Sequence, residues 1–253
     1  DPALACAHMD LAGVRGAVVF GDTRKWKVAD PALRLAMYQA YNDVCLELTA
    51  ATGGRLLYLP DLPTWDPVAA QAEARRVLGL GARAVEFAVY GAGAPLGDPA
   101  WDPLWELAAA RGIPVCSHTG HAAGSAIPPN EHGQKLASHS TSSFVAARPV
   151  ADMVFGGVFE RHPGLTWVMA ESRIGWLPFL FAWMDRQLAI RAPDPTLALR
   201  QAPSEVIRRH VRFTFEEDPV GAKLLREDWS GLQDTVMWGC DYPHPQGVWP
   251  DPG

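Results

Sequence analysis

The feature that most constrains this chain is an alternation of short apolar runs with helix-like segments, which continues from one end to the other. Seven runs predict strands, at residues 14–20, 55–62, 82–88, 113–118, 165–171, 211–216 and 235–241. Seven segments predict helices, at 30–51, 66–80, 101–111, 142–161, 176–190, 204–210 and 219–227. The runs are too apolar for strands with one exposed face, and they favour a parallel sheet with helices on both sides.

No linker or shift in composition divides the chain, so we expect one domain over residues 1–253. An open doubly wound sheet is one alternative. A (β/α)8 TIM-like barrel is favoured, because barrels need about 250 residues and place functional groups on many strands. With seven strands, we expect that barrel to lack its first strand and the chain to be incomplete at both ends. The segment 119–141, rich in Gly, Ser, Pro and His, predicts a long loop.

Composition excludes several classes of protein. The net charge is −6 and no Lys/Arg run is long enough to indicate nucleic acid or an anionic membrane as a partner. No apolar run is long enough to span a bilayer. Four cysteines lie apart without CxxC spacing, which indicates a reducing cytoplasm rather than a disulfide framework.

Two predicted strands end on side chains that can do chemistry. The run at 113–117 leads into His118, and the run at 235–240 leads into Asp241. In α/β enzymes functional groups collect at the carboxyl ends of the strands. A His and an Asp at two strand ends could be two ligands of one metal ion.

Local segments throughout the chain resemble the amidohydrolase-2 family, the group related to aminocarboxymuconate-semialdehyde decarboxylase. Each segment alone is weak evidence, but their order and spacing together are specific. The segments are 8–14, 41–42, 96–99, 102–105, 114–118, 157–163, 175–178, 184–186 and 238–244.

The resemblance implies a metal site and assigns residues to it. In this family an HxH pair on strand one, a His on strand five and an Asp on strand eight hold the metal, and His118 and Asp241 match the last two. It implies one divalent ion, most often zinc, with Asp241 also moving a proton. Two features depart from the pattern. The chain contains no HxH, and Glu171 stands where strand six of the family often carries His.

Four further residues are candidates for the site, each with a structural alternative. Glu171 is a catalytic group or a partner of Arg173. His121 contacts the substrate or the metal ligands, or is a solvated loop residue. Arg173 pairs with a substrate carboxylate, or forms a surface ion pair. His244 contacts the substrate or caps a turn.

The reaction that the resemblance most implies is metal-dependent hydrolysis, in which metal-bound water attacks an amide, lactone or ester-like carbonyl while Asp241 handles the proton. One alternative is non-oxidative decarboxylation of an unsaturated or aromatic carboxylic acid. Another is a relative that binds a small molecule without turnover. The expected partners are a small-molecule substrate and a second copy of the chain, docked through the Trp-rich segment 176–183.

Overall fold

The computed structural model describes residues 1–21, 28–119, 132–191, 199–227, 229–242, 244 and 247. In this part of the chain seven strands form two parallel sheets. The smaller sheet pairs β1 with β2, and the larger has the order β3-β4-β5-β6-β7. The bounds are β1 Ala17–Val19, β2 Leu56–Tyr58, β3 Val85–Glu86, β4 Pro114–His118, β5 Thr166–Ala170, β6 Val211–Phe215 and β7 Val236–Trp238.

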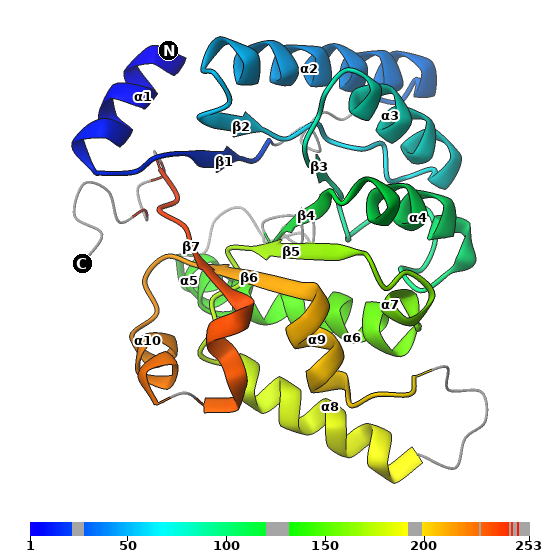
Figure 1. Ribbon diagram of the computed structural model, residues 1–253, viewed down its shortest axis with the longest axis vertical. Helices are drawn as coiled ribbons and strands as arrows, with labels where there is room; N and C mark the ends of the chain where they lie inside the picture. The colour runs from blue at the N-terminus through cyan, green and yellow to red at the C-terminus, as the bar shows by residue number, and fades with distance from the viewer. Residues whose placement is uncertain are drawn as a thin grey trace.

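The strand order follows the chain order, as in a barrel built from successive βα units. A bridge between Asp61 and Glu86 joins the end of β2 to β3, so the two sheets continue into one another. In Figure 1 the helices lie around the outside of these strands. The predicted α/β fold of TIM-like type is therefore confirmed.

Ten α-helices lie in the described residues: α1 Pro2–Leu11, α2 Pro31–Ala51, α3 Pro67–Gly79, α4 Asp102–Arg111, α5 His132–Thr141, α6 Ala147–Phe155, α7 Val158–Arg161, α8 Leu177–Arg191, α9 Pro203–His210 and α10 Pro219–Arg226. Asp30, Asp66 and Asp218 cap α2, α3 and α10, each with Pro in the first turn. Such a side chain accepts from backbone N–H groups that a helix leaves without partners. None of the described helices combines the length and low polarity that a membrane crossing requires.

Three predictions of local structure were wrong. The helix expected over 142–161 is divided into the 3-10 turn η4 (Ser142–Ala146), α6 and α7. It breaks because Gly157 takes a left-handed φ of 69°, and a Cβ on Gly156 would lie 2.8 Å from the Cα of Gly97. The loop expected over 119–141 contains α5, and α1 lies where no element was expected.

The core packs between the larger sheet and its helices, and aromatic rings fill much of it. Trp101, Trp105, Phe87 and Trp167 are all fully buried. The ring of Phe87 lies 4.9 Å from those of both Trp101 and Trp105. Burial of rings of this size stabilises a fold by about 2–3 kcal/mol each, so the β3 and α4 region is firmly anchored.

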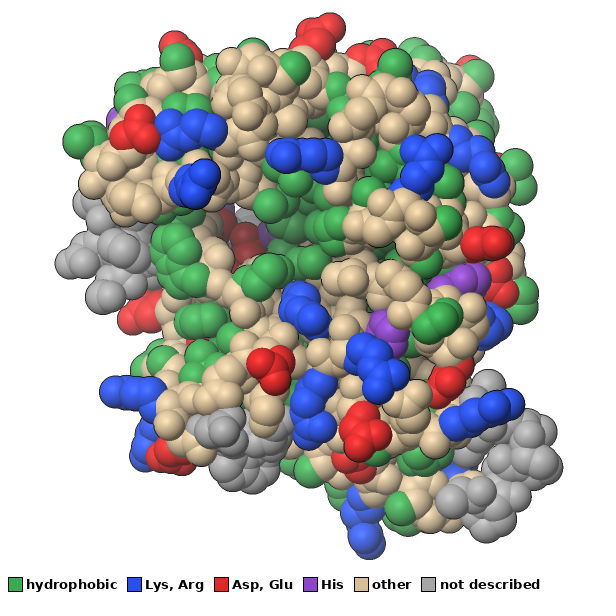
Figure 2. All heavy atoms as spheres, in the orientation of Figure 1, with side chains coloured by type: hydrophobic (Ala, Val, Ile, Leu, Met, Phe, Trp, Pro, Cys, Tyr) green, Lys and Arg blue, Asp and Glu red, His purple; other side chains and the backbone are tan. Residues whose placement is uncertain are grey.

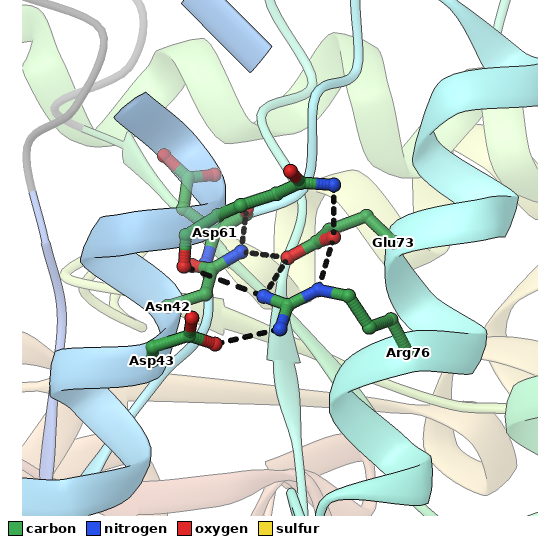
Figure 3. A network of polar contacts seen from close by, with 6 residues as sticks. Asn42, Asp43, Asp61, Glu73 and Arg76 are labelled. Atoms are coloured by element: carbon green, nitrogen blue, oxygen red, sulfur yellow. Dashed lines mark hydrogen bonds and ion pairs between the residues drawn. The ribbon is translucent and has the colours of Figure 1, made fainter. Parts of the chain in front are cut away.

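A polar network ties the end of β2 to α2 and α3 (Figure 3). The Asn42 amide donates to the backbone oxygen of Asp61 at 3.0 Å and accepts from its backbone nitrogen at 2.7 Å. The same amide donates to Glu73 at 2.7 Å, and Arg76 donates to both oxygens of Glu73 at 2.7 and 2.8 Å. Arg76 also reaches Asp43 at 2.6 Å. Buried Glu73 therefore has a full set of donors, including one cation.

Candidate active site

The carboxyl ends of β4, β5 and β7 bring three predicted site residues together. His118 is the last residue of β4, Glu171 directly follows β5, and Asp241 lies three residues beyond β7. His118 and Ala170 are partners in the register of β4 and β5, so the next residue, Glu171, leaves the sheet beside the imidazole. This edge is where parallel α/β folds place their chemistry.

These side chains form one continuous hydrogen-bonded group. His118 Nε2 lies 2.9 Å from Glu171 Oε1. The Glu171 carboxylate is hydrogen-bonded in turn to the carboxyl group of Asp241. Nδ1 of His244 lies 3.3 Å from Asp241 Oδ2. Each of these predicted residues therefore contacts the next one across the site, in the order His118, Glu171, Asp241 and His244.

The backbone beneath the two carboxylates is strained. Glu171, Arg173 and Asp241 have φ angles of 53°, 53° and 52°, in the left-handed region that residues with a Cβ rarely adopt. Such conformations cost about 1–3 kcal/mol each and persist only where surrounding contacts impose them. At Glu171 those contacts are hydrogen bonds to Thr214 Oγ1, at 2.8 Å, and from Thr119 Oγ1, at 3.1 Å. These backbone conformations lower the stability of the fold, and they place the side chains of Glu171 and Asp241 next to each other.

The surroundings of Asp241 favour its protonated form, whereas those of Glu171 favour its ionised form. Burial, followed by the hydrogen bond to Glu171, raises the pKa of Asp241 to about 6. Burial also opposes ionisation of Glu171, but the hydrogen bond and charge of His118 outweigh it and lower the pKa of Glu171. At pH values between the lowered pKa of Glu171 and the pKa of about 6 of Asp241, the pair therefore holds one proton, which resides mainly on Asp241.

Sequence reasoning missed a further carboxylate, Glu216. It directly follows β6, the strand between β5 and β7. Burial, followed by the negative charge of Glu171, raises the pKa of Glu216 to about 7, while nearby Arg173 acts in the opposite direction. The signal that could have found Glu216 is the one that found Glu171: a carboxylate at the end of an apolar strand.

The other predicted residues lie at the edge of this group or outside it. Arg173 is exposed, and its Nη1 donates to the backbone oxygen of Glu217 at 2.7 Å. His121 lies outside the described residues. Phe20, which directly follows β1, places its ring 5.3 Å from that of His118. An aromatic side chain therefore forms one wall beside the imidazole.

The described donors do not complete a metal site. In the described part of the chain, no group of three or more His, Cys, Asp or Glu side chains is arranged to hold a metal ion. His118 and Asp241 have suitable donor atoms, but zinc takes about four ligands, and Glu171 occupies the space between the two. His118 and Asp241 could supply two ligands, and the remaining ligands would have to come from outside the described residues.

Comparison with known proteins supplies further findings. Residues 17–253 match a family described as "Amidohydrolase". A curated relative, the 2-amino-3-carboxymuconate-6-semialdehyde decarboxylase of Dictyostelium discoideum, is 27% identical over 232 residues. The match covers 91% of this chain and 61% of the relative, so the chain spans less than two thirds of that protein's length.

Two solved structures share the fold. The 2,6-dihydroxybenzoate decarboxylase from Rhizobium superposes with a TM-score of 0.76 and 17% identity, covering 94% of this chain and 76% of the other. A dihydroxybenzoic acid decarboxylase from Polaromonas sp. JS666, with bound manganese and the inhibitor 2-nitroresorcinol, gives 0.72 and 17%, covering 95% and 75%. At these identities the likeness shows the fold alone.

The comparisons correct the predicted reaction. Hydrolysis was the expected activity, but the curated relative from Dictyostelium discoideum is a decarboxylase. The prediction of a hydrolase is therefore wrong, and the alternative of decarboxylation agrees better with the findings. The metal in the Polaromonas structure is manganese rather than the expected zinc.

Proposed function

This chain belongs to the amidohydrolase-2 family, and we propose that it removes carbon dioxide, without oxidation, from an unsaturated or aromatic carboxylic acid. The observation that carries the proposal is the convergence of His118, Glu171 and Asp241 at the carboxyl ends of three strands. The Dictyostelium relative, a decarboxylase, supports this reaction over others at such a site.

The reaction needs a proton donor more than it needs a nucleophile. The bond between the carboxylate carbon and the adjacent unsaturated carbon breaks, and carbon dioxide leaves. The electron pair stays on the unsaturated carbon, which then takes up one proton. A neutral acid positioned beside that carbon lowers the barrier of the second event.

Asp241 is the acid in this proposal, because its raised pKa of about 6 keeps a share of it protonated near neutrality. Glu171, hydrogen-bonded to His118, remains an anion beside it and keeps the proton on Asp241. His244, 3.3 Å from Asp241 and more than half exposed, can return a proton from solvent after each turnover. Phe20 offers an apolar wall for a flat substrate.

A divalent ion is part of the proposal, with manganese and zinc as the candidates. Such an ion supplies positive charge for a substrate carboxylate and its neighbouring oxygen. His118 would be one of its ligands, Asp241 would bind it only after giving up its proton, and the remaining ligands would come from outside the described residues. Arg173 is left out, because its guanidinium is exposed and bound to the backbone of Glu217.

The test is release of labelled carbon dioxide from a panel of acids carrying ¹³C in the carboxyl group. The panel contains hydroxybenzoates, methoxybenzoates and muconate-type acids, each with added manganese or zinc, and bound metal is measured by elemental analysis. We expect ¹³CO₂ from at least one acid, and its loss in His118→Ala. The variant Arg148→Ala is the control, because the Arg148 side chain is 82% exposed and, among the residues that the structure describes, pairs only with Asp152, its neighbour on α6.

Two outcomes would overturn the proposal. One is binding of panel acids by the wild type with no release of ¹³CO₂ under any metal condition, which would mark a binding protein without turnover. The other is full activity of folded His118→Ala.

A further inference from the structure

A cavity of about 820 Å³ lies far from the proposed active site, at the opposite end of the strands. Its lining residues fall at position 10 on α1 and at 13–16, 53–55 and 83, just before β1, β2 and β3 begin. The proposed active site lies where β4, β5 and β7 end. Because all strands are parallel, the cavity opens at their amino ends.

The lining of this cavity is rich in positive charge. Among the described residues that form it, Arg15, Arg55 and Arg83 are the cations and Asp10 is the acid. The chain as a whole carries a net charge of −6, so the positive charge of this surface is opposite in sign to that of the whole molecule. Figure 2 shows several Lys or Arg side chains near α1 and β1 on this face of the molecule.

One arginine is fixed and holds the wall together. Arg55 donates to Asp10 at 2.7 Å and to the backbone oxygens of Arg15 and Val14 at 3.2 and 3.3 Å. Asp10 is thus already bound to Arg55, and it leaves the other two cations uncompensated.

The other two arginines keep donors available. Arg83 makes one contact, from Nη2 to the backbone oxygen of Gly54 at 3.2 Å. Arg15 is exposed, and its side chain forms no hydrogen bond or ion pair within the described residues. A guanidinium has five N–H donors in a rigid fork, which suits bidentate binding of carboxylates and phosphates.

Glycines form the rest of the wall and leave the backbone bare. Gly13, Gly53 and Gly54 have φ angles of 68°, 59° and 78°, which glycine adopts without strain. A Cβ on Gly54 would lie 3.1 Å from Nη2 of Arg83, so glycine allows that guanidinium to lie flat against the loop. A ligand can therefore approach both the backbone and the guanidinium closely.

We propose that this cavity binds a small molecule that carries two or more oxyanion groups, either phosphates or carboxylates. Arg15 and Arg83 supply the donors for these groups, and Arg55 shapes the site through its contact with Asp10. The ligand binds away from the reacting groups, so its binding is separable from turnover.

The test is calorimetry of the whole chain with two probes, inorganic pyrophosphate and citrate, at constant ionic strength. We expect at least one probe to bind, and the probe that binds more tightly tells a phosphate ligand from a carboxylate one. In Arg15→Glu the dissociation constant should rise at least tenfold, since each lost charged contact is worth about a factor of ten or more. Arg15→Glu is informative because the Arg15 side chain makes no hydrogen bond or ion pair with another described residue, and its backbone contact with Arg55 is kept.

Two controls keep the result interpretable. Arg148→Glu changes the net charge equally but lies on α6, outside the cavity, and should leave the dissociation constant unchanged. Arg83→Ala should weaken binding in the same direction as Arg15→Glu. Failure of both probes to bind the wild type at millimolar concentration overturns the proposal, and so does equal weakening by Arg15→Glu and Arg148→Glu.

Discussion

Two groups of carboxylates in this molecule differ in the hydrogen-bond donors and cations that surround them. In the network of Figure 3, the buried carboxylate of Glu73 accepts from Asn42 and from both ends of the Arg76 fork. At the strand ends, Glu171, Asp241 and Glu216 lie within electrostatic reach of one another. There the described cationic partners are His118, His244 and Arg173.

The difference shows in the pKa values. The pKa values of the acids at the strand ends differ widely. That of Glu171 is lowered, and those of Asp241 and Glu216 are raised to about 6 and about 7. A carboxylate with matched donors stabilises the fold, whereas interacting acids with too few donors hold a transferable proton near neutrality. Perturbed values of this kind concentrate at functional sites.

The backbone shows the same contrast. Asn42, Glu73 and Arg76 lie within the regular helices α2 and α3. Glu171 and Asp241 lie just beyond strands with left-handed φ angles. The left-handed backbone at the strand-end acids supports the proposal that they serve the reaction, whereas the regular helices around Glu73 fit a role in stability.

Asp241→Asn should have the largest effect. Removing the acid should lower kcat for release of carbon dioxide by about 10²–10⁴-fold, the usual contribution of a general acid, with a much smaller change in KM. Steady-state kinetics on the best acid of the panel measures it. A loss confined to KM would show that Asp241 only binds substrate.

Glu73→Ala should have the largest effect on stability. It leaves the Asn42 amide and the Arg76 fork without their shared acceptor, and breaking a buried pair costs about 3–5 kcal/mol. Urea unfolding measures the change, with Glu47→Ala as the control on the exposed side of α2. Turnover by the fraction that stays folded should change little, and a selective loss of kcat would contradict the separation of the two groups.

Glu216→Gln should stabilise the protein in a pH-dependent way. The folded state raises the pKa of Glu216 from 4.5 to about 7, so folding takes up a proton and stability falls as pH rises through that window. The variant should match the wild type below pH 4.5 and exceed it by about 1 kcal/mol at pH 8, allowing for partial exposure. Unfolding curves at both pH values test this, and an equal effect at each would contradict it.

Asp43→Asn should have the smallest effect. Asp43 is half exposed and meets Arg76 at the rim of the network, and exposed ion pairs contribute about 0–1 kcal/mol. A small change in the urea midpoint is expected, without any effect on turnover. A loss as large as that of Glu73→Ala would show that the rim, not the buried centre, holds the network.

The sequence was sufficient for the order of strands and for the candidate residues His118, Glu171 and Asp241. An apolar run that ends on a polar side chain predicts both a buried strand and a candidate functional residue. The apolar residues fill the sheet, and the polar residue that follows lies at its edge. Asp followed by Pro predicted the starts of α2 and α3 for a local reason, since a cap depends on neighbouring residues only.

Other features depend on contacts between distant residues. The break between α6 and α7 arises where Gly156 meets Gly97, some sixty positions earlier, and no local pattern records that approach. Glu216 acquires its raised pKa from burial and then from the charges of Glu171 and Asp241, which follow the neighbouring strands. The arginine-lined cavity joins three segments that are each unremarkable along the chain.

The most direct test of the contrast between the two groups is a titration of carboxyl protons by infrared spectroscopy between pH 4 and 9. It is made in the Glu216→Gln background, so that the group titrating near 7 is removed. Above the pH range in which ordinary Asp and Glu side chains ionise, we predict one remaining protonated carboxyl band that disappears near pH 6, is absent in Asp241→Asn and persists in Asp43→Asn. If the Asp241 band titrates in the ordinary range of an exposed aspartate, the pair holds no proton near neutrality and the account fails.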